Sequence, residues 1–271
     1  MTPESQIAVR LGLAAGLFVL LALWEWCAPR REAGRGGRWS GNLGLLAVDL
    51  IAVRLVAPTA AVGAALLAAQ HGWGLLPLLH VPYWAAVLAS IVALDLVIYT
   101  QHVVFHHVPL LWRVHRVHHA DTALDVTTGL RFHPVEILLS LAIKVAAVLA
   151  LGAPALAVIV FEVLLNATAM LNHSNVALPQ RLEPVARWLV VTPQMHEVHH
   201  SAERRETDSN FGFNLPWWDR LFGTYRARPA ADEVVIGLPD FREASERTLL
   251  RLMTQPFRRG AMSVQAAEDP E

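Results

Sequence analysis

The chain has 271 residues, of which 54% are hydrophobic and only 17% are charged. A soluble globular protein usually carries about 25% charged residues, so this composition argues against a freely soluble globule and against a disordered chain. The formal net charge of −1, without a basic stripe, argues against nucleic acid as a partner. A single cysteine, Cys27, excludes an intrachain disulfide and a cysteine-based zinc site. Thirteen histidines in so apolar a chain instead indicate a membrane protein that holds metal.

Long apolar segments predict four to five membrane passes. At ~1.5 Å per residue, a helix of about 20 residues covers the ~30 Å hydrocarbon core of a bilayer. We expect the fourth segment to form a hairpin of two passes, because Gly152 and Pro154 interrupt it. The apolar segments span about residues 7–27, 43–70, 83–105 and 134–171.

The first two segments each allow two interpretations. For residues 7–27 a signal peptide is the competing interpretation, but no A-x-A-like site follows, and Trp24 and Trp26 are typical of interfacial anchors. In the second segment, Asp49 and Arg54 lie five residues apart and either pair or reach toward the interface. We interpret both segments as membrane passes.

The charge between the segments predicts their orientation. Four arginines lie between residues 30 and 38, whereas the loop at 71–82 has no Lys, Arg, Asp or Glu. The positive-inside rule therefore places the first loop in the cytoplasm. With alternating passes, every histidine cluster falls on the cytoplasmic side of what we expect to be a bacterial inner membrane. The predicted fold is all-α, an integral membrane helical bundle with a cytosolic helical cap that carries the histidines.

The chain divides into three predicted parts. Residues 1–82 form an N-terminal transmembrane region, residues 83–225 a catalytic domain with the histidine clusters, and residues 226–271 a C-terminal cytosolic segment. Within this last part, residues 242–254 have the pattern of an amphipathic helix, and residues 260–271 are typical of a loose tail.

Three histidine boxes dominate the sequence. At roughly 5% histidine, one H-x-x-H-H pattern is expected by chance about 0.03 times in such a chain, and this chain has two. Residues at i, i+3 and i+4 share one face of a helix, so we expect each box to aim two or three imidazoles at a common point. The boxes consist of His102 and His106; of His115, His118 and His119; and of His196, His199 and His200.

The number of these imidazoles predicts a pair of metal ions. One tetrahedral zinc needs only four ligands, and neutral imidazole also suits iron, copper and nickel. Eight imidazoles with few carboxylates nearby favour an all-nitrogen dinuclear iron site, where iron at the bilayer edge activates O₂ next to an apolar substrate. The alternative is that these histidines cap helix ends in the membrane interface.

An aspartate and a tyrosine extend the face of the first box. Asp95, Tyr99, His102 and His106 are spaced four, three and four residues apart, which is one stripe of a helix. An intramembrane carboxylate is costly without a partner. Asp95 either accepts a hydrogen bond from a ligand imidazole, which fixes its tautomer, or pairs with an arginine. The candidate arginines are Arg113, Arg116 and Arg131.

Residues outside the boxes offer further candidates. We interpret His173, which closes the last apolar segment, as a ligand rather than a core histidine. His133, just before a predicted helix, is an extra ligand, a group that orients a ligand, or a helix cap. Asp219, in a turn-rich aromatic stretch, either supports the third box or belongs to a packed loop. We expect no catalytic role for His71, His80 and His107.

With the segments around them, the boxes resemble those of the fatty acid hydroxylase / sterol desaturase superfamily, whose members are membrane oxygenases with two irons. The resemblance runs from about residue 95 to residue 224, roughly half of the chain, and its motifs are highly specific in combination. The matching segments are 95–106, 112–119, 131–134, 172–175, 192–200 and 218–224.

This resemblance implies a bundle of membrane helices under a cytosolic helical cap. The chain departs from the family pattern at Val103, where many members have arginine, and at Ala169, where some have a further histidine. The second metal is then one ligand poorer, or His133 supplies that ligand. The implied metal ligands are His102, His106, His115, His118, His119, His173, His196, His199 and His200.

We expect a membrane oxidoreductase that uses O₂ and two Fe ions to hydroxylate or desaturate a C–H bond of a lipid-like substrate. No flavin or haem motif is evident, so the electrons must come from a separate reductase, ferredoxin or cytochrome. The rivals are a zinc-dependent membrane hydrolase and a histidine-lined metal carrier. A carrier should have polar groups across the midplane of several helices, whereas the fourth and fifth passes offer only Lys144, Glu162 and Asn166.

Overall fold

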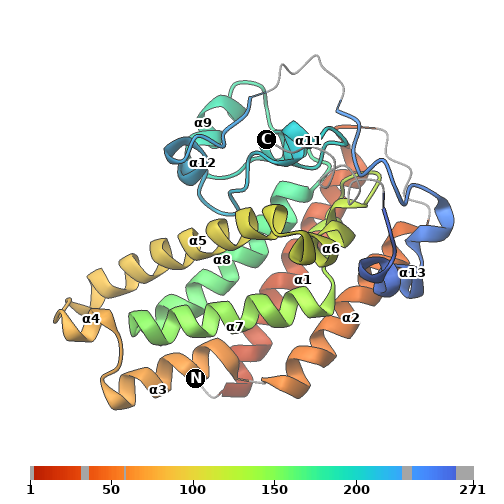
Figure 1. The fold of residues 1–271 in the computed structure, drawn as a ribbon. Coiled ribbons are helices and arrows are strands. Elements are labelled where there is room, and N and C mark those ends of the chain that lie inside the picture. The colour runs from red at the N-terminus through yellow and green to blue at the C-terminus, as the bar shows by residue number, and fades with distance from the viewer. Residues whose placement is uncertain (1–2, 32–36, 58, 228–233, 261–271) are drawn as a thin grey trace.

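The computed structural model describes residues 3–31, 37–57, 59–227 and 234–260, which form helices and no extended strand. Figure 1 shows long helices packed together, with short helices gathered over one end as a cap. The elements are α1 (Pro3–Cys27), α2 (Arg38–Val56), α3 (Ala60–His71), α4 (Leu75–Leu78), α5 (Tyr83–His107), α6 (Pro109–His119), η1 (Thr128–Leu130), α7 (Pro134–Leu151), α8 (Ala155–His173), α9 (Glu183–Leu189), α10 (Pro193–His199), α11 (Arg204–Thr207), α12 (Trp217–Leu221), η2 (Ala244–Arg247), α13 (Leu249–Thr254) and η3 (Gln255–Phe257).

The long helices have the length and composition of membrane spans, which confirms the predicted all-α membrane bundle. Large apolar side chains such as Leu50, Leu67 and Leu88 are exposed on them, as expected of groups that face lipid. In α1, the stretch Gly12–Cys27 is also apolar. Among the described residues, the stretches long and apolar enough to cross a membrane are Arg38–Leu78, Tyr83–His107, Pro134–Leu151 and Ala155–His173.

The second apolar segment differs from the single pass expected at residues 43–70. Its helix begins earlier, at Arg38, and is divided into α2, which ends at Val56, and α3, which begins at Ala60. The sequence has Pro58 between them, and proline lacks the N–H that a continuous helix needs. In Figure 1, α2 runs away from the cap and α3 then follows α7, with which it is in contact.

The predicted hairpin is present as α7 and α8. Gly152 ends α7 with a φ of 66°, a left-handed conformation that glycine adopts without strain, and its N–H bonds back to the carbonyl of Val148 at 3.0 Å. A Cβ at Gly152 would lie 2.3 Å from the carbonyl oxygen of Trp73. The turn between the two helices therefore packs directly on the segment before α4.

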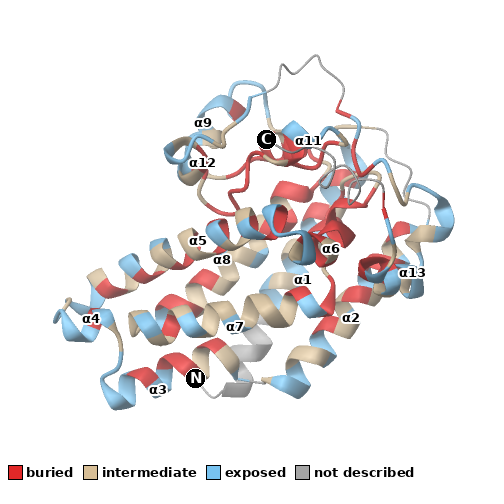
Figure 2. Ribbon diagram, in the orientation of Figure 1, coloured by how far each residue is buried: buried red, intermediate tan, exposed pale blue. Residues whose placement is uncertain are grey.

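Buried apolar side chains of α3, α5, α7 and α8 form the main core, and Figure 2 shows burial concentrated where the bundle meets the cap. On the other side of the cap, α13 packs on α2 and α6 through Leu252, Leu45 and Val117. The amphipathic helix expected at 242–254 is divided into the short η2 and α13. Residues 32–36 of the arginine-rich loop and nearly all of the predicted tail lie outside the described residues.

Candidate metal centre

Nine buried histidines converge where the C-terminal ends of α5 and α8 meet α6 and α10. They are the nine that the family resemblance implies as ligands, and they form two groups. Within each group, one ring nitrogen of every histidine lies within 4.8 Å of those of the others. The first group is His102, His106, His115, His119 and His199, and the second is His118, His173, His196 and His200.

The helical spacing of the boxes explains this division. Histidines four residues apart, such as His115 and His119, are only about 40° apart around the helix axis and fall in the same group. His118 faces the second group instead, and the third box is divided in the same way. Each H-x-x-H-H box therefore aims two imidazoles at one group, as expected, and its remaining imidazole at the other group.

Backbone carbonyls fix the direction of four imidazoles. A carbonyl only accepts hydrogen bonds, so a ring whose Nδ1 contacts one carries its proton on Nδ1 and presents the lone pair of Nε2. The contacts are those of His102 with Phe211 (2.8 Å), His199 with Ser209 (2.7 Å), His118 with Arg131 (3.1 Å) and His173 with Ala169 (2.6 Å).

Two carboxylates orient two further imidazoles. Nδ1 of His115 lies 2.7 Å from Oε1 of Glu136, and Nδ1 of His106 lies 3.2 Å from Oδ1 of Asp208. Such contacts set the tautomer of a metal-binding imidazole and raise its basicity. Neither acid was among the site residues predicted from the sequence. For Glu136 a signal existed, because a carboxylate inside an apolar segment is costly without a partner.

The inward nitrogens fit metal ions better than they fit one another. Nε2 of His173 lies 2.9 Å from Nε2 of both His118 and His196. Because His118 and His173 both carry their protons on Nδ1, two lone pairs face each other, which is unfavourable without a cation between them. Two ligands at right angles around an ion, each with a bond of about 2.1 Å, lie roughly 3 Å apart. Nε2 of His106 and His199 is likewise buried without a partner in the described chain.

Burial keeps these imidazoles neutral. It lowers the pKa of His118, His196 and His200 well below the ordinary 6.5, and neighbouring imidazoles lower it further. Burial also lowers the pKa of His199 to about 3, and it lowers the pKa of His119 well below 6.5. Since a metal binds the neutral ring, these histidines are ready to bind ions at neutral pH.

Asp95 has neither of its predicted partners. Its carboxylate accepts hydrogen bonds from Nδ2 of Asn214 at 2.8 Å, from Nε1 of Trp218 at 2.8 Å and from the N–H of Leu215 at 3.3 Å. The three candidate arginines donate to backbone carbonyls elsewhere. With its oxygens already bonded by the loop before α12, Asp95 ties α5 to the cap instead of holding an imidazole.

Tyr99 and Asp219 act on the same cap loop. The hydroxyl of Tyr99 lies 2.8 Å from Oγ1 of Thr224, which also donates to Asp219 at 2.7 Å. Asp219 accepts the N–H of Phe211 at 2.7 Å, and the carbonyl of Phe211 accepts from His102. Asp219 therefore fixes a loop whose carbonyls orient His102 of the first box and, through Ser209, His199 of the third box, as one of the two interpretations predicted.

His133 lies outside both groups and caps α7. Its Nδ1 accepts the N–H of Val135 at 3.2 Å, and its Nε2 donates to the carbonyl of Met253 at 3.2 Å. Both ring nitrogens are thus used, so His133 has none to offer as an extra ligand, and the second group keeps four imidazoles. His107 also lies outside the groups, with Nδ1 on the carbonyl of Val103.

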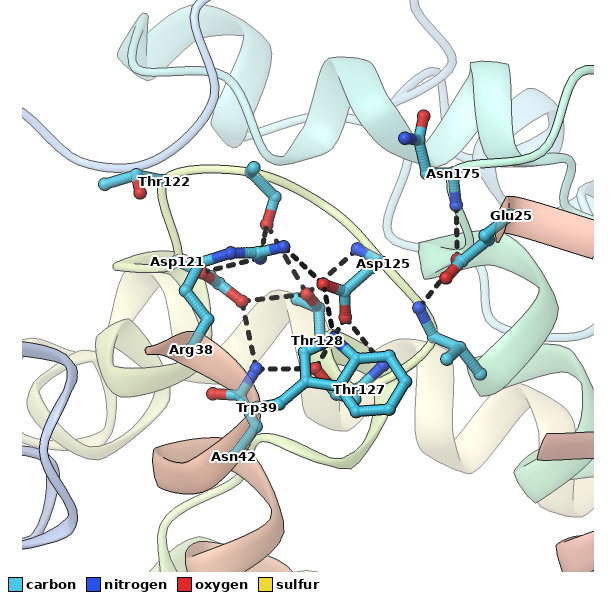
Figure 3. A network of polar contacts seen from close by, with 12 residues as sticks. Glu25, Arg38, Trp39, Asn42, Asp121, Thr122, Asp125, Thr127, Thr128 and Asn175 are labelled. Atoms are coloured by element: carbon cyan, nitrogen blue, oxygen red, sulfur yellow. Dashed lines mark hydrogen bonds and ion pairs between the residues drawn. The ribbon is translucent and has the colours of Figure 1, made fainter. Parts of the chain in front are cut away.

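A buried ion network holds the loop that joins the second box to α7 (Figure 3). Arg38, at the start of α2, lies 3.0 Å from Asp121 and also pairs with Asp125. Burial raises the pKa of Asp121, but the guanidinium groups of Arg38 and Arg131 outweigh it and hold this pKa below its ordinary value. The carboxylate therefore stays charged, and α2 stays attached to the loop.

The end of α1 holds two loops at once. Oε1 of Glu25 accepts the N–H of Val126 at 2.8 Å and the N–H of Asn175 at 2.7 Å (Figure 3). The first loop follows the second histidine box, and the second follows His173. The N-terminal helices carry no histidine of either group. Through Glu25 they fix the backbone that follows the second box and the backbone that follows His173, and the second box and His173 both contribute to the second group.

A cavity of about 280 Å³ adjoins the first group of histidines. His102 and His115 line it at one end, and apolar residues such as Leu46, Phe105 and Leu165 line much of the rest. It lies between α2, α5, α7 and α8. An apolar space beside a histidine cluster is suited to the hydrocarbon part of a substrate.

Comparison with known proteins identifies relatives of this chain. The 173 residues aligned with the ornithine lipid hydroxylase OlsE of Rhizobium tropici are 30% identical and cover 64% of this chain and 50% of that protein. Human alkylglycerol monooxygenase is 29% identical over 153 residues, which cover 55% of this chain and 32% of the relative. Rat cholesterol 25-hydroxylase is 28% identical over 171 residues, which cover 61% and 55% of the two chains.

The chain thus spans about half or less of the length of these relatives. No solved structure matches it. The model of the family described as fatty acid hydroxylase matches residues 87–224, which is half of the chain and includes all nine converging histidines. The chain therefore belongs to the fatty acid hydroxylase family.

Proposed function

We propose that this protein is an integral membrane oxygenase that uses two iron ions and O₂ to hydroxylate a C–H bond of a lipid. The observation that carries the proposal is the pair of buried histidine groups. Within the second group, lone pairs of ring nitrogens face one another at hydrogen-bond distance. One ion per group is the simplest occupation. The ligands would be His102, His106, His115, His119 and His199 for one ion, and His118, His173, His196 and His200 for the other.

Iron explains this ligand set better than zinc does. Catalytic zinc sites have three protein ligands and an open position, and structural zinc sites have four, whereas one group here has five imidazoles. Several relatives are named as hydroxylases or monooxygenases, and such enzymes insert oxygen. Both observations favour a redox-active ion over a hydrolytic one.

When bound, the irons would supply the redox chemistry that activates O₂. Residues of the chain would do the rest. The carboxylates of Glu136 and Asp208 keep the protons of two rings on Nδ1, so that Nε2 stays free. The apolar cavity holds the substrate carbon beside His102 and His115 and excludes water. One oxygen atom enters the alcohol and the other leaves as water, with two electrons and two protons from outside.

Those electrons would come from a separate reductase, ferredoxin or cytochrome. We place this partner, and the cap, on the cytoplasmic side of a bacterial inner membrane, because arginines cluster between residues 30 and 38. Residues 83–225 would be the catalytic domain, and residues 1–82 its membrane support. The contacts of Glu25 and Arg38 with loops of the histidine region support this division of labour.

Metal content and oxygen uptake test the proposal. Protein purified from iron-replete cells should carry about two irons per chain and consume O₂ with reductant and membrane lipid. Lipids from cells with and without the gene, grown under isotopically labelled O₂, should differ by one labelled oxygen atom.

His118→Ala should abolish turnover and lower iron content. His80→Asn should preserve both, since His80 is exposed and has a φ of 51°, which asparagine tolerates. Stoichiometric zinc without O₂ uptake would refute the oxygenase and favour the hydrolase.

A further inference from the structure

The apolar cavity beside the first histidine group contains acceptor oxygens without donors. Oδ1 of Asp49, Oε2 of Glu136 and Oε1 of Gln101 belong to residues that line it, and none has a hydrogen-bond partner within the described part of the chain. The side chains of Asp49 and Glu136 are buried, with 6% and 3% of their surface exposed. A buried acceptor without a donor is destabilising, so these oxygens favour a ligand that donates a hydrogen bond.

No described hydrogen bond from the surrounding protein reaches these three oxygens. No lysine or arginine is among the described residues that line the cavity. The amide groups of Gln101 and Asn166 already donate, to Ser140 at 2.7 Å and to the carbonyl of Glu162 at 2.8 Å. Arg54, one of the two alternatives predicted for Asp49, is exposed and makes no bond to it among the described contacts. A ligand that brings its own donor would satisfy these oxygens.

We propose that Asp49 is a specificity-determining residue, which selects lipids whose polar group donates a hydrogen bond, as a hydroxyl or an ammonium does. This inference rests on the proposed function and names the substrate class of the same site. Asp49 lies on α2, outside the family match at residues 87–224, so this polar contact is an addition from the N-terminal helices.

The size of the cavity also limits where the substrate is oxidised. A cavity of 150 Å³ holds one benzene, so a cavity of about 280 Å³ holds roughly ten to twelve non-hydrogen atoms, which is a fragment of a lipid. His102 and His115 line the same cavity as Asp49 and Glu136. The oxidised carbon therefore lies within about ten bonds of the donor group, and not at a more remote chain terminus.

Binding to the metal-free, detergent-solubilised full chain tests the proposal independently of turnover. The probes are radiolabelled cetyl alcohol and cetylamine, which donate hydrogen bonds, and cetyl methyl ether, which does not. We expect the wild type to bind a donor probe at least about tenfold more tightly than the ether. Asp49→Leu should remove that preference. If the natural polar group is an ammonium, Asp49→Asn should keep its affinity for the alcohol and lose affinity for the amine. If the natural group is a hydroxyl, Asp49→Asn should not strongly weaken the binding of either probe.

Leu46→Ala is the matched control, because it changes an apolar residue on the same helix and in the same cavity. It should weaken the alcohol and the ether alike. Equal binding of alcohol, amine and ether by the wild type would overturn the proposal, as would an equal loss for all probes in Asp49→Leu. If Asp49→Leu loses helix content, the comparison of alcohol, amine and ether binding by the wild type still tests the proposal. Failure of the oxygenase function would show separately, as protein without iron that retains the binding preference.

Discussion

The imidazoles of the two groups are oriented by acceptors of two kinds, and only one kind can be removed by substitution. Backbone carbonyls orient His102, His118, His173 and His199 and persist whatever their side chains become. His106 depends on the carboxylate of Asp208, and His115 depends on that of Glu136. Since the partner of a metal-binding imidazole fixes its tautomer, these carboxylates are where the orientation of a ligand is open to test.

Asp208→Ala should lower the iron affinity of the first group by about 10- to 100-fold, because Nδ1 of His106 loses its acceptor. A competition titration against a chelator measures this affinity. Arg204→Ala is the control, since Arg204 pairs with the same carboxylate at 3.3 Å but does not touch the imidazole. Equal losses in the two variants would mean that the exposed ion pair, and not the contact with His106, matters.

The second histidine group depends on the close approach of η1 to α8. A Cβ on Gly129 would lie 2.5 Å from the carbonyl oxygen of Ala169, and this carbonyl accepts the Nδ1–H of His173. Two backbones meet here without room for a side chain. The position of a candidate ligand thus depends on a glycine that is not near it in the sequence.

Gly129→Ala should destabilise the protein by about 1–3 kcal/mol, the usual cost of overpacking, and should lower metal occupancy of the second group. Thermal unfolding and iron content measure the two effects. Gly16→Ala in α1 is the matched substitution, because nothing lies within 4 Å of its Cβ position. Its stability should stay within about 0.5 kcal/mol of the wild type. A Gly129 variant as stable as the Gly16 variant would contradict the close packing.

Over the whole molecule, the bundle encloses basic groups in neutral form, which makes its stability depend on pH. In the folded protein burial lowers the pKa of His199 to about 3, whereas the ordinary value is 6.5. Between these values the unfolded chain binds more protons than the folded one, so the free energy of unfolding rises with pH. Acidification from neutral pH therefore favours the unfolded chain.

Metal-free protein should lose thermal stability progressively as the pH falls below about 6.5, and the loss from His199 should continue toward pH 3. Unfolding midpoints in one detergent across this range measure the effect. His199→Gln removes one titrating ring and should give a shallower dependence. An unfolding midpoint that does not change between neutral and mildly acidic pH would show that the imidazoles are not buried in neutral form.

Local patterns account for what could be predicted. The apolar segments, the break at Gly152 and the nine histidines that converge depend on hydrophobicity and spacing along the chain, so their order is enough to find them. The function as a lipid oxygenase stays a prediction beyond family membership. The partner of Asp95 was predicted wrongly. Its helical spacing correctly placed it on one face of α5 but could not show which cap residues cover that face.

Contacts between distant segments account for the rest. A periodic sequence fixes the direction of a side chain relative to its own helix, whereas its partner is set by how helices and loops pack. Asp208 meets His106 across 102 positions, and Arg38 meets Asp125 across 87. Asp49 lines a cavity whose other walls come from helices and loops later in the chain. The candidate metal ligands could thus be predicted from the sequence itself. The residues that orient these candidates and line the cavity beside them come together only on folding, because burial and lone-pair geometry arise from packing.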